Sequence, residues 1–212
     1  MKKETANFNL IYYGDDTQDA NKLVNTLEDN VKRITETLGI TPSGKTNVHV
    51  YATQKDFHNA IGRPNAESWV VGTVLAGEIH MVSPSNPGPE HDYDGIMAVA
   101  VHEFAHIVAN ELTQQEPSSR PFLEEGLATY LAGQESQLPA DAEIPSVSTI
   151  ISQNGGDMVY DVGYVFMKFI ANNFGNAGLI EIYKAPETFI QNKPKLEEMW
   201  LNYIKNNMPK EG

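Results

Sequence analysis

The apolar residues of this 212-residue chain change their spacing once, and that change constrains the fold more than any other feature. Before a Pro- and Gly-rich connector at residues 84–90, short β-branched and aromatic runs alternate with helical segments. After it, the long segments repeat apolar residues every three or four positions, which is the spacing of one helix face. This order predicts an α+β fold with a small mixed sheet first and a mostly helical half second. We expect one domain over 1–212, with a sheet-containing lobe at 1–90 and a helical lobe at 91–212.

The same patterns predict the individual segments. We expect strands at 6–13, 47–52, 68–76 and 77–83, the last two as a pair. We expect helices at 17–38, 53–62, 94–112, 121–133, 158–174, 176–184 and about 194–206. Asp92 or Asp94 would cap the helix at 94–112.

Composition excludes several classes of function. The chain has no cysteine, which excludes disulfides, thiolate metal sites and cysteine nucleophiles. Its net charge of -13 argues against nucleic acid or an anionic membrane as a partner. No apolar run approaches the roughly 18 residues of a membrane helix. Two lysines follow Met1 without the apolar run of a signal peptide, so the chain as written is expected to be cytoplasmic. A trimmed signal would make it secreted or cell-surface.

The second half opens with a motif that carries chemistry, His102-Glu103-Phe104-Ala105-His106. Two histidines four residues apart lie on one face of a helix, so both imidazoles can reach one zinc ion at about 2.0–2.1 Å. Glu103 lies beside them and can take a proton from metal-bound water. Three ionisable groups on a buried face would otherwise carry a desolvation penalty without compensation. The motif therefore predicts one Zn²⁺ on His102 and His106, with Glu103 as the catalytic base.

A catalytic zinc needs a third protein ligand and an open position. Eighteen residues separate His106 from Glu125, which lies in the sequence FLEEGLATY at the start of a predicted helix. Glu124 competes with it, and neighbours on a helix point about 100° apart, so only one of them can face the metal. The residues alone leave both open.

The region 102–128 resembles the gluzincin metallopeptidases, most closely the branch of aminopeptidase N and leukotriene hydrolase. That branch carries HExxH, eighteen residues, and then Glu in the context W-L-x-E-G-F/L-A. Residues 122–128, FLEEGLA, fit this frame, so the resemblance implies Glu125 as the third ligand. Thr129, four residues further on, faces the same way and would be a hydrogen-bond partner behind the ligand. An ordinary hydroxyl on the helix surface is the equal alternative.

The resemblance extends to two further segments. In the family, the catalytic tyrosine lies in a segment Y-x-x-G-F/Y, and residues 160–164, YDVGY, are similar to it. This implies that Tyr160 stabilises the oxyanion, with Tyr164 as the alternative. The strand pair at 68–83 is similar to the sheet before the metal helix, whose edge strand receives the substrate backbone. This implies that 77–81 lines the cleft, with Gly77 and Glu78 contacting substrate. A purely structural strand is the equal alternative.

The other histidines give weaker indications. An alternating strand can aim His80 to either side. His49, His58 and His91 have no partner at ligand spacing, and we do not expect them to be functional. The Gly-x-Met-Glu-Asn segment of the aminopeptidase branch is absent, so the better match is the group of small, stand-alone peptidase-MA-like bacterial domains, over nearly the whole chain.

The resemblance therefore implies a thermolysin-like or gluzincin core with the zinc site between its sheet and helical parts. The expected activity is hydrolysis of peptide bonds by a metal-activated water, with a peptide or protein as substrate. Two alternatives stay open. One is a zinc-binding domain that recognises peptide or protein without turnover, and the other is a zinc hydrolase of a non-peptide bond.

Overall fold

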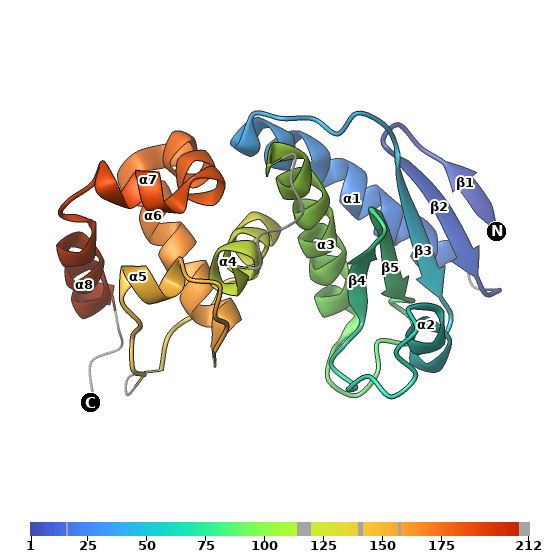
Figure 1. Ribbon diagram of the computed structural model, residues 1–212. Helices are drawn as coiled ribbons and strands as arrows, with labels where there is room; N and C mark the ends of the chain where they lie inside the picture. The colour runs from blue at the N-terminus through green and yellow to red at the C-terminus, as the bar shows by residue number, and fades with distance from the viewer. Residues whose placement is uncertain (16, 114–119, 140–141, 157, 208–212) are drawn as a thin grey trace. The chain divides into compact units, whose positions relative to one another are not determined.

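A computed structural model describes the chain except for residues 16, 114–119, 140–141, 157 and 208–212 (Figure 1). The chain divides into two compact units, Met1–Glu111 and Leu112–Gly212. The first holds a mixed sheet and the second is helical, which confirms the α+β prediction. The division falls later than the predicted lobe boundary at residue 90, because the helix that carries the HExxH motif groups with the sheet.

The sheet of the first unit has five strands in the order β1-β2-β3-β5-β4. The pairs β2–β3 and β3–β5 are parallel, whereas β1–β2 and β4–β5 are antiparallel. The strands are β1 (Lys2–Glu4), β2 (Phe8–Tyr13), β3 (Thr46–Tyr51), β4 (Gly72–Leu75) and β5 (Glu78–Val82). Strand β4 therefore forms one edge of the sheet and β5 lies inside it.

Helices α1 (Thr17–Leu38) and α3 (Tyr93–Thr113) cover one face of this sheet (Figure 1). Alternate strand residues point toward them and are fully buried, among them Phe8, Leu10, Val48, Val50, Ile79 and Met81. Phe8 packs edge-on against Phe104 of α3, with ring centroids 5.1 Å apart. The short helix α2 (Gln54–Ala60) begins after Thr53, whose hydroxyl accepts a hydrogen bond from the Asp56 N–H.

Two hydrogen bonds fix the start of α3. The Asp92 carboxylate accepts a hydrogen bond from the Gly95 N–H at 2.7 Å. Of the two candidate caps, Asp92 and Asp94, it is therefore Asp92 that caps the helix. The Tyr93 hydroxyl donates to Asp19 of α1 at 2.9 Å. The motif helix is thus anchored to α1 at Tyr93, about two and a half turns before His102.

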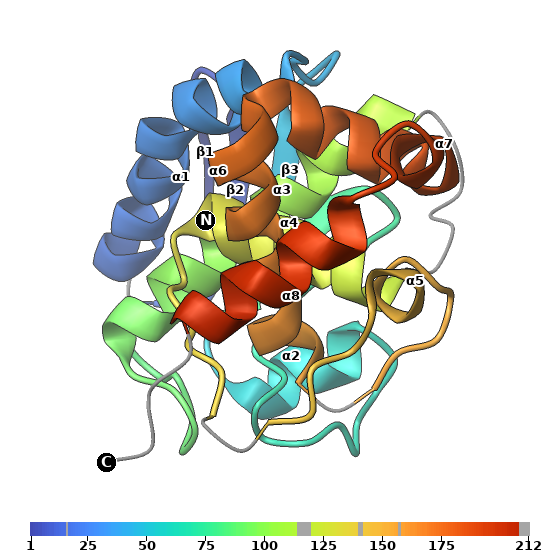
Figure 2. The ribbon, with the colours of Figure 1, turned by 90° about the vertical axis from the view of Figure 1, so that its left-hand side faces the viewer.

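The second unit contains α4 (Pro121–Ala132), α5 (Val147–Ile150), α6 (Val159–Lys184), α7 (Pro186–Gln191) and α8 (Leu196–Asn207). Figure 2 shows α8 crossing α6, where Trp200 packs against Phe166 and Phe169 with ring centroids 5.2 and 5.5 Å apart. The two helices predicted at 158–174 and 176–184 form α6, which is interrupted at Gly175 with φ 64 and ψ -163. Helices α5 and α7 were not predicted.

No helix in the described residues combines the length and the apolar character that crossing a bilayer requires.

Candidate functional site

The HExxH motif lies in the middle of α3, as predicted, and its two histidines face each other. Nε2 of His102 and Nε2 of His106 are 3.0 Å apart, and the ring planes are inclined at 77°. Two nitrogens that bind one tetrahedral zinc at about 2.0–2.1 Å are roughly 3.4 Å apart. The pair therefore needs only a small separation of its rings to share an ion.

Glu103 lies at the contact between α3 and the edge strand β4, and it is only 8% exposed. A Cβ atom added to Gly72 of β4 would come within 3.2 Å of Oε1 of Glu103 and 2.7 Å of Cγ1 of Val99. An alanine at position 72 would therefore require the side chains of Val99 and Glu103 to shift. The carboxylate of the candidate base therefore lies beside Gly72 of β4.

The second unit carries Glu124 and Glu125 in the first turn and a half of α4. The Glu124 carboxylate accepts a hydrogen bond from the Arg120 N–H at 3.1 Å, so it satisfies a backbone donor at the start of its own helix. Glu125 points about 100° further round the helix. This gives the competing carboxylate a local structural role, and Glu125 as the third ligand stays a prediction.

Glycines explain the sequence context of Glu125. A Cβ atom at Gly126 would lie 2.5 Å from the carbonyl carbon of Gly163, and one at Gly163 would lie 2.6 Å from the Phe122 oxygen. Helices α4 and α6 thus cross with their backbones in contact. The crossing fixes the backbone beside Glu125, and on α6 it lies one turn after Tyr160.

Thr129 lies one turn after Glu125 and is 4% exposed. Within the part of the chain that the structure describes, its buried hydroxyl has no hydrogen-bond partner. Such a group in a native interior calls for an explanation. The role that the resemblance implies, a hydrogen bond behind a metal-binding carboxylate, would provide one and stays a prediction.

The structure distinguishes the two candidate tyrosines by their surroundings. Tyr164 is 4% exposed, and Lys168 lies against it with Nζ 5.4 Å above the ring and 3.4 Å from the hydroxyl. That hydrogen bond is the main cause of the raised pKa of Lys168. Tyr160, in the first turn of α6, is 46% exposed. Tyr164 is a core residue, and Tyr160 is the phenol that solvent can reach.

Tyr183 in the second part of α6 was not identified from the sequence. Burial, together with the negative charges of Glu124 and Glu125, raises its pKa well above the ordinary value. It therefore keeps its proton near these carboxylates. Position 183 lies beyond the break at Gly175 and has no fixed spacing from α4, so the sequence offered no signal for it.

Gly77 and Glu78 lie at the β4–β5 hairpin. Ala76 and Gly77 have φ of 53° and 78°, the positive values that a two-residue hairpin requires. Strand β5 pairs with β3 on one side and β4 on the other, so residues 77–81 do not form the edge strand expected from the resemblance. The free edge on this side of the sheet belongs to β4. Substrate contact by Gly77 or Glu78 stays a prediction.

Glu78 instead faces a group of polar side chains on β3 and β5. Its carboxylate accepts a hydrogen bond from Asn47, which holds the pKa of Glu78 below its ordinary value, and lies 2.9 Å from Nε2 of His49. His80 is its other neighbour, and burial, followed by the effect of nearby His49, lowers the pKa of His80. Sequence reasoning did not connect these residues, because their proximity depends on the pairing of β3 with β5.

His58 and His91, which were not expected from the sequence to be functional, each bond a backbone carbonyl. Nε2 of His58 bonds the Val70 carbonyl at 2.8 Å, and Nε2 of His91 bonds the Trp69 carbonyl at 2.9 Å. Both bonds hold the segment that leads into β4.

Comparison of the sequence with models of known protein families gives no match, and a search of curated proteins finds no significantly similar sequence.

Proposed function

We propose that this protein is a zinc-dependent metallopeptidase of the gluzincin type. The observation that carries the proposal is the arrangement on α3, where two imidazole nitrogens lie 3.0 Å apart and a buried carboxylate adjoins them. The spacing of eighteen residues from His106 to Glu125 and the sequence FLEEGLA support the assignment. So does the engagement of Glu124 at the start of α4.

The donor set fits zinc. Two imidazoles and one carboxylate are ligands that zinc accepts, and a catalytic site of this kind keeps a further position open. His102, His106 and Glu125 would hold the ion, and Thr129 would orient Glu125. Zinc, when bound, lowers the pKa of its water and polarises the scissile carbonyl.

The chain's own residues would then perform the proton transfers. Glu103 accepts a proton from the attacking water and delivers it to the leaving amine. The Tyr160 hydroxyl donates a hydrogen bond to the oxyanion of the tetrahedral intermediate. Both steps belong to the hydrolysis of a peptide bond, so the proposed substrate is a peptide or protein.

Strand β4 would bind the substrate backbone. It is an edge strand, and its Gly72 lies beside Glu103. An extended peptide added to this edge would extend the sheet by main-chain hydrogen bonds. It would then run past the carboxylate that acts on its scissile bond.

The deciding experiment compares wild type with Glu103→Gln. Both are loaded with zinc, incubated with a mixed peptide pool and analysed by mass spectrometry, and the zinc content of each is measured. We expect new cleavage products with wild type alone, at equal zinc content. Identical products from both proteins would refute the role of Glu103. No products from zinc-loaded wild type would favour a recognition domain, or a hydrolase of a non-peptide bond if ester or epoxide substrates are turned over.

A further inference from the structure

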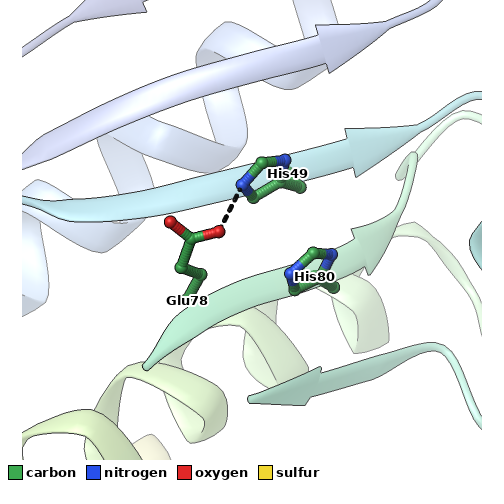
Figure 3. A group of neighbouring side chains, drawn as sticks. All are labelled: His49, Glu78 and His80. Carbon is green, nitrogen blue, oxygen red and sulfur yellow. Dashed lines mark hydrogen bonds and ion pairs between the residues drawn. The ribbon is translucent and has the colours of Figure 1, made fainter. Parts of the chain in front are cut away.

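A second group of candidate metal ligands lies on the other face of the sheet, away from α1 and α3 (Figure 3). His49 of β3 and His80 of β5 are direct partners in the parallel pairing, so their side chains leave the sheet on the same side. Val48 and Val50, which flank His49, are buried on the opposite, helix-covered face. Glu78, two residues before His80, shares the face of the histidines.

The three side chains converge. Their candidate ligand atoms all lie within 4.8 Å of one another. Nε2 of His49 is 2.9 Å from Oε2 of Glu78, and the two imidazole rings stack with centroids 4.5 Å apart and planes 4° apart. Each strand therefore contributes one imidazole, and β5 adds the carboxylate.

Each of the three side chains is also held by its other polar atom. Nδ1 of His49 bonds the Tyr13 hydroxyl at 3.0 Å, and Nδ1 of His80 bonds the Tyr51 hydroxyl at 3.0 Å. The second carboxylate oxygen of Glu78 accepts from Asn47. Metal-binding histidines and carboxylates in proteins are held in this way, with the non-ligating atom fixed by a neighbour. In the structure, Nε2–H of His49 donates to the Glu78 carboxylate. When the ring protons lie on Nδ1 instead, with the tyrosine hydroxyls as acceptors, both Nε2 atoms offer lone pairs to an ion.

We propose that His49, Glu78 and His80 form a second divalent-cation site, distinct from the HExxH motif, that takes a transition-metal ion such as Zn²⁺. The ligand set is two imidazoles and one carboxylate, for which zinc is well suited. A bound ion would join β3 to β5 through their side chains, in addition to the main-chain ladder.

Binding requires a modest rearrangement. Ligand atoms on one tetrahedral zinc are roughly 3.4 Å apart, so the stacked rings tilt toward each other and the carboxylate moves in. Glu78 can do so because its side chain is 36% exposed, compared with 13% for His49. That exposure also leaves room for water as a fourth ligand.

The competing explanation is a ladder of stacked rings without a metal. Tyr13 stacks on Tyr51 at 4.9 Å, and Tyr51 stacks on His80 at 6.0 Å, so the same side chains also contribute to packing. A pure ladder predicts no zinc binding at this face, whereas the proposal predicts one zinc per chain there. Metal stoichiometry therefore distinguishes the two.

The test uses the full chain, saturated with ZnCl₂, freed of excess by gel filtration and analysed for metal content. We expect about two zinc ions per chain in wild type and about one in Glu78→Gln and in His80→Asn. The matched control is His91→Asn, which changes another histidine of the first unit and should keep the wild-type content. Of the two substitutions, Glu78→Gln is the less disruptive to folding. Its side chain is the most exposed of the three, and a glutamine oxygen still accepts a hydrogen bond from Asn47.

A second arm separates this site from the proposed active site. In the double variant His102→Asn/His106→Asn we expect one zinc to remain. When zinc is titrated into the metal-free double variant, the ring-proton NMR signals of His49 and His80 should shift together and stop shifting at one equivalent. A metal content unaffected by Glu78→Gln and His80→Asn, or a double variant without zinc, would overturn the proposal. A metal content unaffected by the double variant would instead refute the proposed catalytic zinc and leave the sheet site standing.

Discussion

The crossing of α4 and α6 makes Gly126→Ala the sharpest structural test. The new Cβ would lie 2.5 Å from both the carbonyl carbon and the oxygen of Gly163, where ordinary contacts begin at 3.4 Å. The atoms in the way are backbone, so the helices must separate by roughly 1 Å, because no rotamer change can relieve the contact.

The magnitude follows from two opposing effects. Alanine stabilises a helix interior relative to glycine by about 1 kcal/mol. Overpacking a tight contact costs about 1–3 kcal/mol, and contact with rigid backbone lies at the upper end. We expect a net loss of about 2 kcal/mol, or roughly 4–8 °C in apparent melting temperature for a chain of this size.

Thermal unfolding followed by circular dichroism measures this effect. The matched control is Gly156→Ala, whose Cβ would make an ordinary contact at 3.7 Å with Phe122. It should change the melting temperature little. If Gly126→Ala melts at or above the wild-type temperature, the close crossing of the two helices is wrong.

Three further predictions concern the candidate site. Glu125→Ala should lower the zinc content, whereas Glu124→Ala should keep the zinc and lower the free energy of unfolding by about 0.5–2 kcal/mol, as the loss of a helix cap does. If metal analysis shows the reverse, Glu124 is the ligand. Tyr160→Phe should lower kcat at unchanged zinc content, whereas Tyr164→Phe should act mainly on the melting temperature; unchanged peptide turnover in Tyr160→Phe would contradict the oxyanion role. Gly72→Ala should displace the general base and lower kcat more than zinc affinity, and wild-type kinetics would contradict the close contact of β4 with α3.

The sequence predicted best what depends on neighbours along the chain. The amphipathic stripe of α1 and the glycine after it located the helix to the residue, because Gly39 adopts a positive φ of 64°. Helical periodicity alone was enough to predict that His102 and His106 share one face of a helix. Strand β1 was missed because its residues, Lys2–Glu4, are polar and become a strand only by pairing with β2.

Features that depend on strand pairing or helix crossing could not be predicted in this way. Alternation says which residues of a strand share a face, but not which strands are neighbours, so His49 and His80 appeared unrelated. The edge position was assigned to residues 77–81 for the same reason. Conversely, the motif glycines at 126 and 163 were matched by resemblance, and only the structure shows the steric reason for them.

The shortness of β4 has a consequence for substrate length. The strand has four residues, which at about 3.3 Å per residue cover roughly 13 Å. Only alternate residues of an edge strand direct their N–H and C=O groups outward, so about two residues of β4 can bond an added chain. If β4 binds the substrate, kcat/KM should rise with peptide length up to about four residues along the strand and then level off. Peptides longer than this would then compete for the enzyme on nearly equal terms, whatever their length.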